Sequence, residues 1–194
     1  CETDAFANIN FTDTIVQDNM VCDLLLSDSC NVTAENVSID NTEAFYTGGF
    51  FVANGYLNIS NSSITNVTSS VFAAIAVYDG DLLLENTEIS GHSELTSVGV
   101  IGNSTAEITN SQIISNESSE DYGALVFDDN VNATVSQSDF GTPANGDDNT
   151  VADVQADDMH YLVGDNIDFS CSNGHCGTSV SDTVEADGST NPLS

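Results

Sequence analysis

Carboxylates are the side chains of this sequence whose types and spacing best suit chemistry. Four aspartates recur at one turn of successive repeats, namely Asp79, Asp81, Asp128 and Asp129. A glycoside hydrolase needs only two or three carboxylates at set separations, one as the acid and one as the base or nucleophile. Aspartate at an exposed β-turn is more often a plain turn former. We therefore predict no enzyme, with hydrolysis of a polysaccharide as the alternative.

A second group of carboxylates could bind a metal ion. The candidate ligands are Asp147, Asp148, Asp153, Asp157 and Asp158. Hard oxygen ligands of this kind suit Ca²⁺, although their spacing is not that of an EF-hand loop. The alternative is a solvated acidic loop. Calcium is the one cofactor that the sequence suggests.

The charge balance excludes several partners. The 194 residues include 31 Asp and Glu, no Lys or Arg and three His, which gives a formal net charge of −31. Such a chain repels nucleic acid and anionic lipid head groups and attracts Ca²⁺ or Na⁺. Enzymes that cleave acidic polysaccharides by elimination need Lys or Arg to neutralise the sugar carboxylate. We therefore predict that lyase activity is absent.

A repeated phrase organises the chain. Segments such as GYLNISNSSI (55–64) and DLLLENTEI (81–89) alternate apolar and polar residues, and each carries an amide three positions before an apolar residue. The amides lie 24–29 residues apart and are Asn8, Asn36, Asn61, Asn86, Asn110, Gln137 and Asn166. A repeat of this length is typical of a solenoid.

The alternation within each phrase predicts strands. Leu57, Ile59 and Asn61 should share the inward face, because side chains in a strand alternate with period 2. A second strand follows in each repeat, with the inward pairs Phe50/Val52, Ile75/Val77, Val100/Gly102 and Ala124/Val126. The sequence thus predicts an all-β fold, a single parallel β-helix of about seven coils of 24–29 residues. The amides should stack as a ladder inside a turn, unless they serve only as turn residues.

The predicted domain boundaries follow from where the phrase is regular. We expect a β-helix over 1–176 and a polar tail without fixed structure over 177–194. The β-helix comprises an irregular first coil (1–30), a regular body (31–140), an acidic insertion (141–158) and a closing coil (159–176). No apolar run is long enough to span a membrane.

The five cysteines suggest an oxidising compartment. Four of them form two local pairs near the ends, Cys22 with Cys30 and Cys171 with Cys176. We predict disulfides that hold the terminal coils, with zinc as the alternative for the second pair because His160 and His175 lie close by. Cys1 has no local partner in this scheme. We predict that it carries a lipid anchor, as in bacterial lipoproteins, or forms a disulfide between chains.

Nine Asn-x-Ser/Thr sequons are candidates for glycosylation. Two of them, Asn36 and Asn61, belong to the predicted buried ladder, where a glycan would not fit. The remaining candidates are Asn10, Asn31, Asn58, Asn66, Asn103, Asn116 and Asn132. Strand alternation produces this pattern by itself, so occupancy stays open.

The body of the chain resembles a known group of repeats. Phrases such as GGFFVANGYLNISNSSI (48–64) are similar to the right-handed parallel β-helix repeats of bacterial surface proteins in the pectin-lyase-like superfamily, including polymorphic outer-membrane-protein-type repeats. The resemblance covers about residues 30–176 and implies a right-handed β-helix on an exported protein. It implies little about function, because this superfamily holds lyases, hydrolases, adhesins and structural rods.

Together these features predict an exported, non-catalytic structural or adhesive protein, extracellular or on the cell surface. Its partners would be copies of itself, stacked head to tail into a filament, or surface glycans. It would meet a membrane only through a lipid anchor. One alternative is a monomer whose ends are covered by 141–158 and 177–194. The other is a glycan-binding or hydrolytic β-helix, in which Tyr46, Tyr78 and Tyr122 would matter.

Overall fold

The computed structural model describes most of the first 140 residues and short segments beyond them. The described ranges are 7–18, 25–45, 47–94, 96–118, 124–127, 131–140, 149, 154–156, 167–171, 175–178 and 183–188. The regular elements in these ranges are strands, which form three sheets. No helix there is long and apolar enough to cross a membrane.

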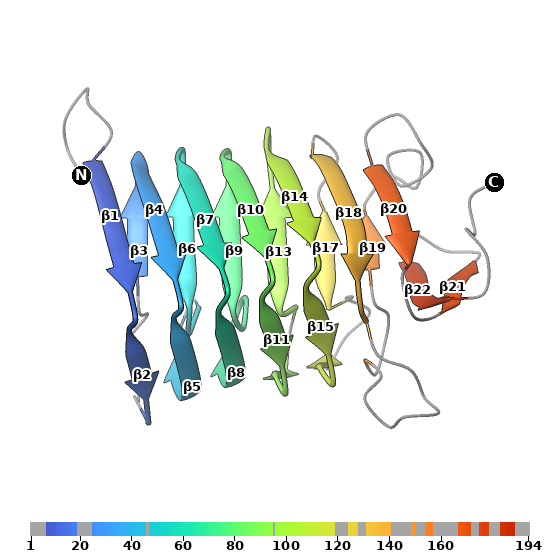
Figure 1. The fold of residues 1–194 in the computed structure, drawn as a ribbon, viewed down its shortest axis with the longest axis horizontal. Helices are drawn as coiled ribbons and strands as arrows, with labels where there is room; N and C mark the ends of the chain where they lie inside the picture. Colours follow the sequence, from blue (N-terminus) through green and yellow to red (C-terminus); the bar gives the residue numbers. More distant parts are fainter. Residues whose placement is uncertain are drawn as a thin grey trace.

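The first sheet holds seven parallel strands and runs along the long axis of the molecule (Figure 1). Its strands, in spatial order, are β1 (Ala7–Thr12), β4 (Cys30–Glu35), β7 (Tyr56–Ser60), β10 (Asp81–Glu85), β14 (Thr105–Thr109), β18 (Asn132–Ser138) and β20 (Ile167–Cys171). Each coil of the chain contributes one strand, so the spatial order follows the sequence order.

The second sheet continues each coil and is also parallel. Its strands are β2 (Ile15–Gln17), β5 (Ser38–Ala44), β8 (Ser63–Ser69), β11 (Glu88–Ser90), β12 (Ser93–Glu94), β15 (Gln112–Ile114) and β16 (Glu117–Ser118). The long strand β8 pairs with both β11 and β12, because a bend at Gly91 and His92 divides the strand of the following coil.

The third sheet closes each coil behind the first (Figure 1). Its strands are β3 (Leu25–Asp28), β6 (Phe50–Ala53), β9 (Ile75–Tyr78), β13 (Val98–Ile101), β17 (Leu125–Phe127), β19 (Val154–Ala156), β21 (His175–Thr178) and β22 (Thr183–Gly188). Pairing is parallel from β3 to β19. Strand β22 then joins β19 in the antiparallel sense, and β21 pairs with β22.

The predicted all-β solenoid is confirmed, with parallel sheets wound into about four regular turns between Cys30 and Phe127. The predicted count of seven coils is not confirmed. The C-terminal region also differs from the prediction, because β22 lies in the segment that we expected to be a tail without fixed structure. Its backbone groups pair with β19, which pairs with β17 on its other side, and the polar composition did not reveal this pairing.

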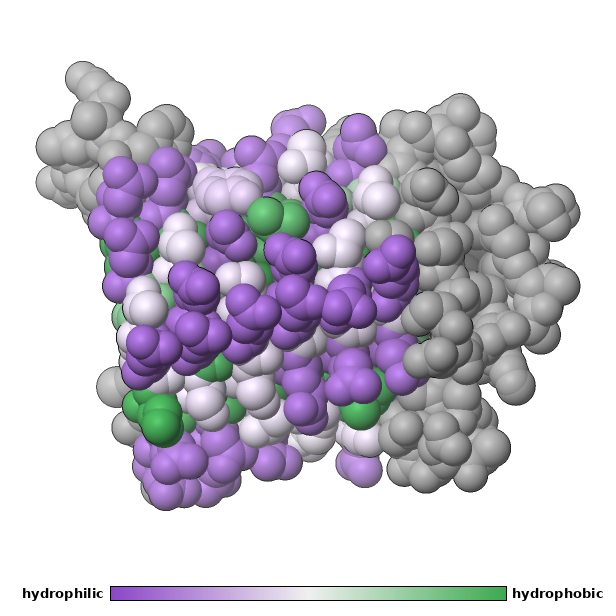
Figure 2. Space-filling view, viewed as in Figure 1, coloured by the Kyte–Doolittle hydropathy of each residue, from purple (hydrophilic) through white to green (hydrophobic). Residues whose placement is uncertain are grey.

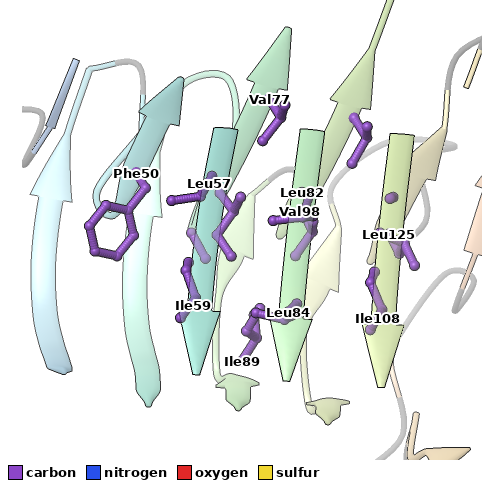
Figure 3. Close-up of a cluster of buried hydrophobic side chains, with 14 of the residues drawn as sticks. Phe50, Leu57, Ile59, Val77, Leu82, Leu84, Ile89, Val98, Ile108 and Leu125 are labelled. Atoms are coloured by element: carbon purple, nitrogen blue, oxygen red, sulfur yellow. The ribbon is translucent and has the colours of Figure 1, made fainter. Parts of the chain in front are cut away.

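Side chains from all three sheets fill one core (Figure 3). Leu57, Leu82 and Ala106 occupy one register position of the first sheet, and the next inward position holds Ile59, Leu84 and Ile108. All six are between 0% and 4% exposed. Complete burial of a Leu or Ile side chain contributes about 2 kcal/mol, so this stacked interior is the main stabilising element of the fold.

The inward pairs of the third sheet were predicted correctly for two coils and wrongly for two. In the latter, the inward residues are Val98 and Val100 on β13, and Leu125 and Phe127 on β17. The bend that leads into the third sheet differs in length from coil to coil. The prediction counted a fixed distance from the amide, so in these coils it assigned residues to the wrong face of the strand. It placed Gly102 inside, although Gly102 lies at a corner with φ +74°.

Candidate functional site

The left-handed backbone positions of the chain mark the three outer corners of the coils. One corner, between the first and second sheets, is the amide corner: Asp13, Asn36, Asn61, Asn86, Asn110 and Gln137, with φ between 48° and 54°. A second corner carries Asp18, Asn41, Asn66, Gly91 and Ser115, and a third carries Ser29, Asn54, Asp79 and Gly102. Asn, Asp and Gly tolerate this conformation best, which explains their recurrence.

The predicted amide ladder lies outside the core and not within it. Asn36, Asn61, Asn86, Asn110 and Gln137 are all exposed, because the left-handed residue ends the strand alternation and turns its side chain toward solvent. Asn8 is not a member, since it pairs in register with Asn31 and the first-coil position belongs to Asp13. Asn166 lies outside the described residues.

An open groove of about 870 Å³ runs along the amide corner. Its walls carry the exposed amides, hydroxyls such as Ser38 and Ser63, and the carboxylates of Glu88 and Asp139. Two contacts link successive coils: Asn36 Nδ2 donates to Asp13 Oδ1 at 3.2 Å, and Asn110 Nδ2 donates to Asn86 Oδ1. The groove is therefore a polar surface of neutral amides and hydroxyls with two carboxylates, which suits ligands with hydroxyl groups or cations.

Amides also serve as the partners of carboxylates at the other corners. Asn41 Nδ2 donates to Asp18 Oδ1 at 2.6 Å, and Asn54 Nδ2 donates to Asp28 Oδ1 at 3.0 Å. Asp40 accepts from Asn66 Nδ2 at 2.8 Å and from Thr65 Oγ1 at 2.9 Å, and these bonds lower the pKa of its carboxyl group. In a chain without Lys or Arg, Asn side chains thus supply the hydrogen-bond donors that meet the carboxylates of the preceding coil.

A ladder of hydroxyl groups is buried beneath the amide corner. Its members, each directly after a corner amide, are Ser62, Thr87, Ser111 and Ser138. Ser62, Ser111 and Ser138 each accept a hydrogen bond from a backbone N–H of the preceding coil, as in Thr87 N to Ser111 Oγ at 3.2 Å. Ser62, Thr87 and Ser111 also donate to the carbonyl two residues earlier. The buried backbone N–H groups of Val37, Thr87 and Ser111 thereby have hydrogen-bond partners.

A second buried ladder crosses the bend of the second sheet. Val67 N donates to His92 Nδ1 at 3.0 Å, His92 N donates to Asn116 Oδ1 at 3.2 Å, and Asn116 N donates to Asn149 Oδ1 at 3.0 Å. The two asparagines also donate to backbone carbonyls, Asn116 Nδ2 to Ile89 O at 3.3 Å and Asn149 Nδ2 to Ile113 O at 2.9 Å. His92, Asn116 and Asn149 therefore act as successive steps of one polar stack.

His92 is the one titratable member of this stack. Its ring is 1% exposed, and burial lowers the pKa of His92 to about 4, although the carbonyl groups of Val67 and Ile64 oppose this shift. Nδ1 lies 3.0 Å from Val67 N and 3.3 Å from Val67 O, whereas Nε2 has no hydrogen-bond partner among the described residues. The ring is neutral at pH 7 and has no direct path to solvent, so its position suits structure better than acid–base catalysis.

The candidate catalytic carboxylates lie at the third corner. Asp79 and Asp81 line a shallow depression of about 300 Å³ together with Tyr56 and Asn103. Asp79 Oδ1 accepts from Asn103 N at 2.9 Å, and Asp81 Oδ1 accepts from Thr105 Oγ1 at 2.6 Å. Burial, and then the charges of Asp81 and Glu107, raise the pKa of Tyr56. Both carboxylates thus bond to the next coil.

Several predicted residues lie outside the described ranges. They are Asp128, Asp129, Tyr46, Tyr122, Cys1, Cys22, His160, Asp157, Asp158 and the acidic residues Asp147, Asp148 and Asp153. The calcium prediction therefore stays untested, and no group of three potential metal ligands occurs among the described residues. Tyr78 is described and is 47% exposed.

The structure describes only some of the cysteines that were predicted to form disulfides. Cys30 is buried and disulfide-bonded, but the predicted partner Cys22 lies outside the described residues. Cys171 ends β20 and Cys176 lies in β21, with side chains that are not described. Both pairings therefore stay predictions.

The structure corrects two statements about the sequons. Asn116 was a candidate for glycosylation, yet it is 3% exposed and bonded within the core. Asn36 and Asn61 were set aside as buried, yet both are exposed. In each case the sequence did not show on which side of the bend the asparagine points.

The two buried ladders were missed by reasoning from the sequence. A signal for the first was present, because a hydroxyl residue directly follows the corner amide in Asn61-Ser62, Asn86-Thr87, Asn110-Ser111 and Gln137-Ser138. The second had no readable signal. Its members differ in type, and the spacing from Asn116 to Asn149 is longer than one repeat.

No protein-family model, curated protein or solved structure matches this chain. The similarity to pectin-lyase-like repeats therefore stays a prediction, and the structure is the basis for the proposed function.

The corner geometry predicts an ordering of variants at Asn61, which is exposed and has φ 50°. Asn61→Gly should change the free energy of unfolding by less than about 1 kcal/mol, since Gly adopts this conformation freely. Asn61→Val should lower it by about 2 kcal/mol, because a β-branched residue is strained there. Urea unfolding followed by circular dichroism measures both. Equal stability of the two variants would show that the corner is not left-handed.

Proposed function

We propose that this chain is an exported, non-catalytic structural or adhesive solenoid of the cell surface that stacks end to end into filaments. The observation that carries the proposal is the incomplete burial of the first described coil. Its inward residues Ile9, Phe11 and Val16 are only partly buried. Their register partners in the next coil, Val32, Ala34 and Ile39, are all 0% exposed. A further coil placed on this end would complete the burial.

The backbone at the same end supports stacking. Among the described strands, β1, β2 and β3 each pair on one side only, with β4, β5 and β6 respectively. An edge strand is a template for another strand, and here three edges lie at one end. A head-to-tail contact between opposite ends does not close on itself, so its repetition gives a filament. We also propose that the chain follows a right-handed path of seven coils, one for each strand of the first sheet.

The charge of the subunit sets a condition for assembly. At −31 per chain, neighbouring subunits repel each other unless cations screen them. Na⁺ at high concentration or Ca²⁺ at a lower one would supply this screening. Assembly should therefore depend on salt.

The bonding of the carboxylates supports a role without catalysis. Asp79 and Asp81 each use one oxygen to accept a hydrogen bond from the next coil. Asp18, Asp28 and Asp40 likewise accept from Asn side chains of the next coil. These five aspartates thus contribute to the cohesion of the rod.

A pair of variants in the first coil tests the stacking proposal. Ile9→Asp places a charge among the partly buried residues of this coil, and it should abolish assembly. Ile15→Asp adds the same charge on an outward side chain, which is 72% exposed, and it should assemble like the parent. Sedimentation velocity in high salt measures assembly, and circular dichroism confirms that both variants fold. If Ile9→Asp assembles as well as Ile15→Asp, this end is not the contact.

Export and anchoring are tested on the protein from its own cells. Cell fractionation should place it outside the cytoplasm, and mass spectrometry of the peptide that contains Cys1 should show a lipid on this residue. An unmodified thiol at Cys1 would rule out the lipid anchor, and a cytoplasmic protein would rule out export.

A glycan-binding or hydrolytic solenoid is the second candidate, favoured by the depression that brings Asp79, Asp81 and Tyr56 together. Release of reducing sugar from a panel of polysaccharides, lost in Asp79→Asn and in Asp81→Asn, would establish it in place of the structural role.

A further inference from the structure

Five of the nine sequons of this chain lie on one side of the rod, whereas Asn36, Asn61 and Asn66 are exposed at the corners and Asn116 is buried. Strand alternation in the first sheet turns both the Asn and the hydroxyl residue two positions later outward. Four sequon asparagines lie on its strands, and one more lies at the corner that leads into β14. These five residues, here called the sequon face, are Asn10, Asn31, Asn58, Asn132 and Asn103. Figure 2 shows that the side of the molecule carrying this sheet is largely hydrophilic.

The side-chain amides of this face are available. Asn10, Asn103 and Asn132 are exposed, and Asn31 and Asn58 are half-buried between their strand neighbours. Asn31 Nδ2 makes a long contact of 3.4 Å with Asn8 Oδ1. The side-chain amides of the other four form no hydrogen bond with a described residue. Most corner asparagines, such as Asn41 and Asn54, donate from the side-chain amide to the preceding coil, so the four unbonded amides on one face are available for another role.

Other parts of the rod contrast with this face. Several outward positions of the third sheet hold apolar residues, among them Phe51, Ala76 and Val126, and its described strands contain no sequon. The sequon at Asn116 is buried, with its amide bonded to Ile89 O and to Asn149. The structure therefore separates sequons that can carry a glycan from one that cannot.

We propose that the sequon face is N-glycosylated and forms a glycan-covered side of the rod. In the transfer, the Asn Nδ2 attacks the anomeric carbon of an oligosaccharide carried on a lipid diphosphate. The carbon–oxygen bond to the diphosphate breaks, its electron pair leaves with the lipid diphosphate, and Nδ2 loses one proton to a base of the transferase. The inference rests on the export part of the proposed function, because the acceptor chain must reach the transferase.

The position of the glycans is compatible with stacking. The side chains of a sheet stand roughly perpendicular to it, so glycans on the first sheet extend sideways from the rod and leave its ends uncovered. Asn10 and Asn58 lie two strands apart in the same register row, with Thr33 between them, a separation of about 10 Å. Bulky, solubilising glycans would also keep this side of the rod from binding other protein.

The test uses protein isolated from its own cells. Trypsin cannot cut a chain without Lys or Arg, so endoproteinases specific for Asp and Glu supply the peptides for mass spectrometry. We expect glycopeptides at Asn10, Asn58, Asn103 and Asn132, and an unmodified peptide at Asn116. Asn58→Gln should lower the intact mass by one glycan, and Asn116→Gln should remove none.

The outcomes separate the two proposals. Protein found outside the cell with unmodified asparagines overturns the glycan inference and leaves export standing. Protein confined to the cytoplasm overturns both. A glycan at Asn116, with the sequon face unmodified, contradicts the assignment of the faces.

Discussion

Replacement of His92 by Asn should remove a distinct part of the acid sensitivity of this protein. In the folded chain the pKa of His92 is about 4, against 6.5 for an ordinary His. The unfolded chain therefore takes up a proton first as the pH falls, and the stability that depends on the neutral ring is lost between pH 6.5 and pH 4. By pH 5 this loss amounts to about 2 kcal/mol. Asn116 and Asn149 fill the same position in later coils, so His92→Asn should fold.

Denaturant unfolding at pH 7.5 and pH 5 measures this effect, since the sequence pI of about 4.1 makes lower pH unsuitable. The difference in unfolding free energy between the parent and His92→Asn should change by about 2 kcal/mol in favour of the variant. The carboxylates titrate in both proteins and cancel in this comparison. Parallel pH profiles would contradict the burial and neutrality of His92.

Asn116→Ala should destabilise the protein far more than a substitution at an exposed corner asparagine. Asn116 is 3% exposed, accepts from His92 N and donates to Ile89 O and to Asn149. Its removal leaves a buried N–H and a buried carbonyl without their partner. At about 1–3 kcal/mol for each such group, the unfolding free energy should fall by at least about 3 kcal/mol. Urea unfolding at pH 7.5 gives this value.

Asn110→Gly is the matched control, six residues earlier in the same coil. Asn110 belongs to the exposed amide corner, with φ 48°, and Gly keeps the left-handed conformation. The variant loses one exposed amide contact with Asn86, which should cost about 1 kcal/mol or less. If the two variants lose equal stability, the buried ladder is not a distinct stabilising element.

The sequence predicted what depends on strand alternation and on the repeat. Leu57 and Ile59, with their counterparts on β10 and β14, lie inside as expected. In a strand every second side chain faces the interior, and these positions are apolar in the sequence. The same argument placed Asn61 inside and was wrong. One left-handed residue ends the alternation, and a residue's type does not reveal its φ. The exposed side of Asn36 was missed for the same reason.

The candidate site was less predictable, because its groups come from different coils. Asp79 meets Asn103, and His92 lies between Val67 and Asn116, all through register rather than through a local motif. The pairing register depends on bend lengths that vary between coils, as the shifted pair Val98 and Val100 shows. Counting along the chain therefore identified the repeat, but it did not identify which polar groups face each other.

Electron microscopy of the purified protein, with millimolar Ca²⁺ or high salt and again with chelator at low salt, tests the proposed role most directly. The partly buried first described coil and the pairing of β1, β2 and β3 on one side only among the described strands predict filaments when cations screen the charge, and single rods when they do not. A monodisperse population of single rods in millimolar Ca²⁺ and in high salt would contradict the proposal.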